Sequence, residues 1–199
     1  MIKTYTRIGE EGRLKALEIV NTLPGIDYSK ELRLANVLTG DNKKQRLQEN
    51  ILLLLRLINN NFSYRLIEFY DNIEEKIEIL KKNINLIELV VGKNLYRFNI
   101  PCKNFAFDIA SCYGKKEDQE NTLYWLNKSL NYAQALDNVP NEGKYDSYWI
   151  NDANYSFPKI ENYDGQEKMF DITSFDFIRD TDEFKNIKNK YLKLYGINV

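Results

Sequence analysis

The side chains best suited to chemistry in this chain are carboxylates, which gather near the C-terminus. Residues 161–183 carry eight acids against two basic side chains. Asp176, Asp180 and Asp182 could ligate a metal ion, but their spacing lacks the glycine and the terminal glutamate of a calcium-binding loop. Helix caps and solvated helix faces also account for acids at such positions. As a patch, they favour a basic partner and disfavour nucleic acid.

The absence of histidine excludes several classes of enzyme. Without an imidazole there is no Ser-His-Asp or Cys-His catalysis and no ordinary zinc site, because two cysteines supply too few soft ligands. Cys102 and Cys112 lie roughly 15 Å apart along a helix axis, so we expect reduced thiols. The glycines form neither a GxxxxGK[ST] nor a GxGxxG pattern. We therefore predict a protein without a cofactor and without enzymatic activity.

A helical hairpin at residues 105–130 must position any site in the C-terminal half. Apolar residues recur there at offsets of three and four in two blocks, which is typical of amphipathic helices. Gly114 and the polar run 115–121 separate the blocks, and Asp118 or Asn121 can cap the second helix. The two stripes comprise Phe105, Ile109, Ala110, Cys112 and Tyr113, then Leu123, Leu126 and Leu130.

The hairpin resembles the tetratricopeptide repeat family, whose unit is a helix, a turn and a helix. Ala110 and Tyr113 match the small residue and the aromatic residue near the end of the first helix. Asp118 matches the turn acid, whereas Glu117 replaces the usual turn glycine. Further matches and departures are Ile109, Leu123 and Leu130 at core positions, with Thr122 and Ser129 in place of alanine.

Residues 170–187 resemble the closing segment that often follows the last repeat, in which a short helix and an Arg-Asp pair precede a terminal helix containing phenylalanine. The resemblance implies a protein-binding function. It also implies that the outward face of the first helix lines a binding groove. In this register those residues are Asn104, Phe107, Ser111 and Lys115.

The N-terminal half also has helical periodicity, in the ranges 10–21, 27–40, 41–58, 62–70 and 73–91. Glu78 and Lys82 are spaced to pair on a solvated face of the last of these. Residues 86–100 remain ambiguous, because Tyr96, Phe98 and Ile100 alternate as a β-hairpin would, while a helix followed by a loop is the alternative. We predict an all-α fold in which antiparallel helical hairpins stack as a short repeat-like solenoid or bundle.

Length and hydrophobicity are typical of a soluble globular protein. The chain has 199 residues and is 43% hydrophobic, which suffices for a full core. We expect one domain, residues 1–199, with N-terminal helices in 1–100 and the hairpin, an insertion and a closing helix in 101–199. Its N-terminus is charged throughout, and its longest apolar run, 51–55, is too short for a bilayer. We therefore expect a cytoplasmic protein with no membrane partner.

The segment 137–165 is rich in aromatic residues and contains Tyr148 and Trp149. Long insertions between helices are uncommon unless they pack or function. Exposed tyrosine and tryptophan anchor protein interfaces at small entropic cost, so these two side chains are candidate binding residues. The alternative is a short helix around Trp149 that packs on the preceding hairpin.

These observations predict a non-catalytic protein-interaction module whose partner has a basic surface. Richness in Asn, Ile and Lys indicates an AT-rich bacterial genome, which makes an immunity protein that neutralises a toxin the specific hypothesis. A hydrolase that uses carboxylates and a metal ion, and a structural subunit of a larger assembly, are the alternatives. Three or more acids converging in one pocket would favour the hydrolase. A purified protein that is not stable and monomeric alone would favour the subunit.

Overall fold

A computed structural model describes residues 11–12, 40–63, 65–156 and 166–197. Contacts group the chain into two units, residues 1–50 and 51–199. The predicted helix 27–40 lies outside the described residues except for Gly40, and of the predicted helix 10–21 only residues 11–12 are described.

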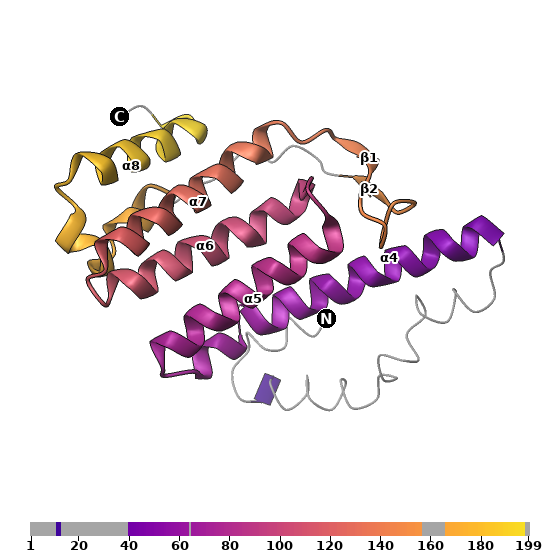
Figure 1. Cartoon of the computed structure of the whole chain (residues 1–199), viewed down its shortest axis with the longest axis horizontal. Coiled ribbons are helices and arrows are strands. Elements are labelled where there is room, and N and C mark those ends of the chain that lie inside the picture. The colour runs from indigo at the N-terminus through magenta and orange to yellow at the C-terminus, as the bar shows by residue number, and fades with distance from the viewer. Residues whose placement is uncertain (1–10, 13–39, 64, 157–165, 198–199) are drawn as a thin grey trace. The chain divides into compact units, whose positions relative to one another are not determined.

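The described residues form an all-α fold, as predicted. The long helices are α4 (Gly40–Ile58), α5 (Ile73–Val91), α6 (Asn99–Gly114), α7 (Gln119–Asp137) and α8 (Asp182–Leu194). Helix α5 packs on α6, α6 on α7, and α7 on α8, so neighbours in sequence are neighbours in space (Figure 1). None of the described helices combines the length and the apolar character needed to span a bilayer.

Helix α5 has the predicted bounds, and its local sequence explains them. The side chain of Asn72 caps its N-terminus by accepting a hydrogen bond from the Glu74 N–H at 2.8 Å. Gly92 ends the helix with φ +92°, a conformation that favours glycine. The predicted pair of Glu78 and Lys82 forms at 3.4 Å. The buried stripe of α5 follows the period of a helix and comprises Ile77, Leu80, Ile84, Ile87 and Val91.

The prediction of a helix at residues 62–70, before α5, is wrong, and the two alternatives for residues 86–100, at its C-terminal end, are resolved. The range 62–70 is not a regular α-helix. Asn59–Ser63 closes α4 with a π-helical turn, and Leu66–Phe69 is a 3₁₀ turn, η3. Residues 86–100 adopt the helix-and-loop alternative, because α5 continues to Val91 and a 3₁₀ turn, η4 (Tyr96–Phe98), leads into α6.

Helices α6 and α7 form the predicted hairpin. Ala110 and Phe105 are fully buried in the core. Asp118 caps α7, because its Oδ1 accepts a hydrogen bond from the Asn121 N–H at 3.0 Å. Glu117, in the turn, has φ 55°, a left-handed conformation that costs a non-glycine residue about 1 kcal/mol. Cys102 and Cys112 are free and buried, and burial raises the pKa of both thiols.

The aromatic-rich insertion contains two short antiparallel strands, β1 (Glu142–Lys144) and β2 (Asn154–Ser156). Gly143 pairs with Tyr155 in their register. Between the strands, Ile150 N–H donates to Ser147 O and Ala153 N–H donates to Ile150 O, each at 3.0 Å. These two consecutive turns replace the short helix that was one interpretation of this segment, and the residues 157–165 lie outside the described range.

The closing segment contains the 3₁₀ turns η5 (Gln166–Asp171) and η6 (Thr173–Ile178), followed by α8. Phe170 is fully buried and meets the rings of Phe184 and Tyr191 at centroid distances of 6.0 and 5.3 Å. Arg179 holds the two turns together, because its guanidinium donates to the carbonyl oxygens of Phe170 at 3.3 Å and Ile172 at 3.2 Å. The 3₁₀ turn η6, the pair Arg179 and Asp180, and helix α8 thus follow one another along this segment.

Polar contacts also tie α8 to the hairpin. The Ser129 hydroxyl donates to the Lys103 carbonyl oxygen at 2.9 Å and lies 3.2 Å from the Tyr191 hydroxyl. The Lys103 ammonium donates to the Tyr195 hydroxyl at 3.4 Å. Burial lowers the pKa of Lys103, because desolvation disfavours its charged form.

Candidate functional site

Residues 145–150, termed the aromatic turn, present two large aromatic side chains to solvent. Tyr148 is 97% exposed and Trp149 is 56% exposed. By contrast, Tyr145, Ser147 and Ile150 in the same turn are buried. The turn is therefore anchored on the helices by some side chains while its aromatic tip remains accessible.

Aromatic contacts fix one side of this turn. The ring of Tyr145 lies edge-on to Tyr96, with centroids 5.4 Å apart, and is tilted against Phe98 at 6.4 Å. Both partners belong to η4, the short turn that leads into α6. Such pairs contribute about 0.5 to 1.5 kcal/mol beyond the area they bury.

Hydrogen bonds fix the other side. The Ser147 hydroxyl donates to the Val90 carbonyl oxygen at 2.6 Å and accepts a hydrogen bond from the Trp149 N–H at 3.2 Å. The Asn94 amide donates to Asp146 Oδ2 at 2.6 Å. The backbone beneath Trp149 is therefore held at the C-terminal end of α5, so binding through this side chain would require little ordering.

The anchors of this turn were missed by sequence reasoning. Tyr145, Ile150 and Ala153 are buried, while Tyr148 and Trp149 between them are exposed. The sequence signal that could have identified these anchors is an aromatic-rich loop in which an aliphatic residue and a small residue follow the exposed pair at short intervals. It does not tell which aromatic residue faces inward, because that depends on η4 and α5.

Two of the predicted groove residues, Phe107 and Ser111, contact the closing segment. Phe107 is half-buried, and its ring lies edge-on to Phe170 and Phe175 with centroids 5.7 and 5.5 Å apart. The Ser111 hydroxyl lies 3.1 Å from the Ser174 hydroxyl, and Asn104 is half-buried. Residues 166–178 therefore cover part of Phe107, and its binding role remains a prediction.

Ser111 and Lys115 also line a shallow groove of about 310 Å³ between α5, α6 and η3. Four charged side chains line it, namely Asp108 and Lys115 from α6 and its C-terminal end, Lys76 from α5 and Glu68 from η3. The carboxyl group of Asp108 reaches solvent at the mouth, but surrounding protein crowds it, and this desolvation raises the pKa of Asp108 to about 6.

The substitution Asp108→Asn removes a carboxylate whose ionised form is disfavoured by desolvation in the folded chain. We expect it to raise the free energy of unfolding at pH 7 by about 1 kcal/mol, a small value because solvent at the mouth screens much of this desolvation penalty. The raised pKa means that the folded chain holds this proton more tightly than the unfolded chain. The stability that the wild-type chain gains by holding this proton is present below about pH 4 and is lost as the pH rises through about 6. Urea unfolding at pH 4, 5, 6 and 7 measures it, and a difference between variant and wild type that does not depend on pH would contradict it.

The predicted acidic residues lie on and beside the closing segment. Asp176 forms an ion pair and a hydrogen bond with Arg179. Asp180 is exposed and lies 3.7 Å from the Lys185 ammonium, and Asp182 is exposed in the first turn of α8. Within the ranges that the structure describes, no group of three or more Cys, Asp or Glu side chains is placed to hold a metal ion.

The predicted site residues do not form one surface. Ser111, Lys115 and the closing segment lie at the C-terminal end of α6, whereas the aromatic turn lies beside its N-terminal end. A helix of 16 residues is about 24 Å long. This distance exceeds the Debye length of about 10 Å at 0.1 M salt, so the two groups act as separate surfaces.

Comparison with known proteins finds no protein family, no curated protein and no solved structure that matches this chain.

Proposed function

We propose that this chain is a non-catalytic protein-binding module whose primary anchor is the aromatic turn. A repeat-like hairpin would serve as its scaffold. The observation that carries this proposal is the exposure of Tyr148 and Trp149, at 97% and 56%, on a turn whose neighbouring side chains are buried. Large amphipathic side chains on an anchored backbone are the type of residue that dominates binding energy at interfaces.

Charges near the turn favour a basic partner. Asp146 belongs to the turn, and Glu142 and Asp152 flank it, while Lys144 is the nearest lysine in the segment. Complementary charge raises the association rate more than the affinity. Asp180 and Asp182, at the far end of α6, would steer a partner only if it is large enough to reach both surfaces.

The specific case that we propose is a cytoplasmic bacterial immunity protein that binds and neutralises a toxin. It is supported by the acidic closing segment of the chain and by its composition. Inhibition of this kind needs only a rigid surface complementary to the toxin, and the aromatic turn, whose neighbouring side chains are buried, is the surface that we propose for this role.

The test is capture of the partner from the source cell with the tagged full-length chain, identification by mass spectrometry, and measurement of affinity with purified components. Trp149→Ala is expected to weaken binding by about 2 kcal/mol, which is roughly thirtyfold. Phe69→Ala is the matched control, because Phe69 is an aromatic residue that is 81% exposed on η3, away from the turn.

Two results would count against this function. If Tyr148→Ala and Trp149→Ala both bind the partner like wild type while remaining folded, the aromatic turn is not the anchor. If capture returns no partner and the purified chain turns over a substrate, the module is an enzyme. For the toxin case, the captured toxin should lose activity when mixed with the wild-type chain and regain it with Trp149→Ala.

A further inference from the structure

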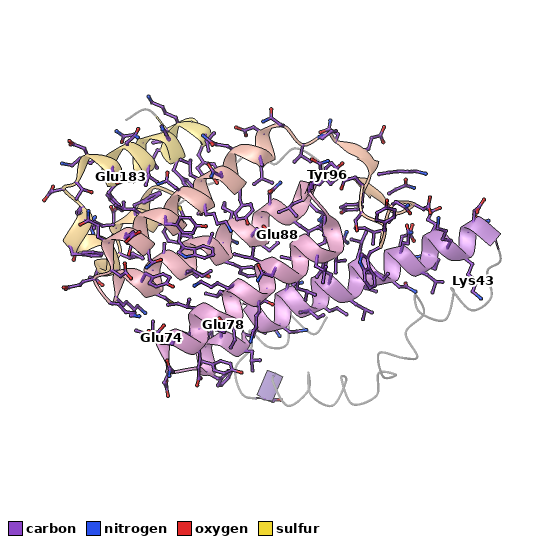
Figure 2. The ribbon with its side chains drawn as sticks, viewed as in Figure 1. Lys43, Glu74, Glu78, Glu88, Tyr96 and Glu183 are labelled. Atoms are coloured by element: carbon purple, nitrogen blue, oxygen red, sulfur yellow. The ribbon has the colours of Figure 1, made fainter. Side chains whose placement is uncertain are left out.

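A cleft of about 930 Å³ lies where α5 and α7 end, and none of the residues that line it was predicted from sequence. Its walls are the C-terminal end of α5, the loop 92–95, the start of α6 and the last turns of α7. This volume falls within the range of small-molecule sites, about 300 to 1,000 Å³. Figure 2 shows Glu88 and Tyr96, two of its lining residues, at the same end of the helices as the β1–β2 hairpin.

Side-chain amides are the main polar feature of the cleft, which Asn94, Asn99, Asn131 and Asn138 line. Each amide group combines hydrogen-bond donors with an acceptor, and a ligand hydroxyl group needs both. Asn131 on α7 and Asn138 at its C-cap are both exposed. They are seven residues apart, which is about two helical turns or 10.5 Å along the axis. The amides are therefore spread along the cleft and could contact more than one unit of a chain-like ligand.

One of these amides is built into the fold. Asn99 is only 6% exposed, and its Nδ2 donates to the Tyr96 carbonyl oxygen at 2.9 Å. This bond fixes the amide plane, and among the described residues no group donates to its Oδ1. Tyr96 itself has φ 49°, and its ring lies edge-on to Tyr145 with centroids 5.4 Å apart. Residues held in such sparsely populated conformations cluster at ligand sites.

A carboxylate is also held in place within the cleft. The Tyr132 hydroxyl of α7 donates to Glu88 Oε1 of α5 at 2.8 Å, so this bond joins two walls. The second carboxylate oxygen and the lone pairs of the phenol oxygen can accept further hydrogen bonds. Hydrogen bonds from a hydroxyl group to a carboxylate are strong, because the acceptor is charged. The cleft thus offers a fixed acceptor to a ligand that carries hydroxyl groups.

The charges of the lining balance, which favours a neutral ligand. Glu88 and Lys93 are its charged side chains within the ranges that the structure describes. Lys128 lies one turn before Asn131 on α7 but is not part of the lining, and its ammonium lies 5.0 Å from the centroid of the Trp125 ring. A ligand with phosphate or sulfate groups is normally bound by several Arg or Lys side chains. The lining does not supply such a set.

Apolar side chains complete the lining and suit the C–H faces of sugar rings. They include Ala135, Val139 and Pro140, together with the rings of Tyr96 and Tyr132. A peptide ligand usually depends on large side chains that fill deep apolar pockets, whereas these apolar residues are short. An oligosaccharide presents hydroxyl groups and C–H faces side by side, so it matches a lining in which amides and small apolar groups alternate.

We propose that this cleft binds a neutral oligosaccharide, with its hydroxyl groups paired to the amides of Asn99, Asn131 and Asn138 and to the carboxylate of Glu88. Its C–H faces pack on the apolar lining. This activity is additional to protein binding through the aromatic turn, because no residue of that turn lines the cleft.

The first test applies the tagged full-length chain to an array of neutral, sialylated and sulfated glycans, and titration calorimetry then gives the Kd of the best binder. We expect neutral glycans to be bound. Their Kd should change by less than about twofold between about 50 mM and about 500 mM NaCl, because salt screens only interactions between charges. Preference for charged glycans, or no glycan bound, would overturn the proposal.

The second test places the oligosaccharide in the cleft. Ala135→Trp fills the space between Asn131 and Asn138, whereas Gln134→Trp adds the same side chain at an exposed position outside the lining. The Kd of the selected oligosaccharide should rise at least about tenfold for Ala135→Trp and by less than about twofold for Gln134→Trp. Asn131→Ala should raise it about fivefold, the loss of one hydrogen bond, while Gln134→Ala should not. Equal Kd values for the two tryptophan variants would overturn the assignment to this cleft.

Two further measurements separate this proposal from its alternatives. If adenosine raises the Tm of wild type but not that of Ala135→Trp, the cleft holds a nucleoside and the proposal is wrong. Trp149→Ala should bind the oligosaccharide like wild type, whether or not it still binds the protein partner, because Trp149 does not line the cleft. A loss of oligosaccharide affinity in this variant would place the sugar at the aromatic turn and would likewise overturn the proposal.

Discussion

Phe170→Ala is expected to lower the free energy of unfolding by about 3 to 5 kcal/mol, the range for removing a fully buried phenylalanine. The Phe170 side chain is 0% exposed and touches three aromatic rings, those of Phe107, Phe184 and Tyr191. These rings come from α6 and from α8, so the resulting cavity would lie where the closing segment joins the hairpin. Collapse around it is restricted, because the neighbouring rings are themselves buried or wedged together.

Equilibrium urea unfolding followed by circular dichroism measures this loss. Phe69→Ala is the control, because a phenylalanine that is 81% exposed should change stability by less than about 0.5 kcal/mol. A similar small loss for Phe170→Ala would mean that the closing segment does not pack on α6 in solution. A lower denaturant dependence in the variant would show that the segment detaches before the helices unfold.

Gly114→Ala is expected to cost at least about 2 kcal/mol, although alanine is the better helix former by about 1 kcal/mol. A Cβ built on Gly114 would lie 2.3 Å from the carbonyl oxygen of Ser174 and 3.1 Å from its carbonyl carbon. These are backbone atoms of η6, so relief requires a shift of the whole turn rather than a change of rotamer. The end of α6 and the closing segment are thus in direct contact only because position 114 has no side chain.

Gly40→Ala separates this crowding from backbone strain. Gly40 has φ +56° and nothing within 4 Å of a built Cβ, so its substitution should cost only the strain of about 1 kcal/mol. Thermal or urea unfolding of both variants gives the comparison. If Gly114→Ala proves stabilising, as helix propensity alone predicts, η6 does not lie against α6.

The sequence predicted the bounds of the long helices well where the helical period of the apolar residues and a capping residue marked the same boundary. Helix α5 begins after the capping Asn72 and ends before Gly92, and α7 begins after Asp118. In these places local chemistry alone decides the bounds. The 62–70 range failed because its apolar residues suit a helix by period, whereas the chain there forms two short turns between α4 and α5.

The candidate site was less accessible to sequence reasoning, because it depends on contacts between distant residues. Tyr148 and Trp149 could be identified as exposed aromatics, but the bond from Ser147 to Val90 spans 57 residues. Phe107 is covered by Phe170 and Phe175, two residues that are distant from it in sequence.

The turn between α6 and α7 has a consequence for how relatives of this chain would vary. Glu117 adopts φ 55°, a conformation in which glycine is unstrained and asparagine or aspartate costs less than glutamate. Position 117 is therefore free to drift among these residues during evolution. Position 114 is not, because the neighbouring backbone leaves no room for any side chain. We expect sequences that descend from a common ancestor to share Gly114, which ends α6, and to differ at position 117 in the turn. A motif built on a conserved turn glycine assumes the reverse.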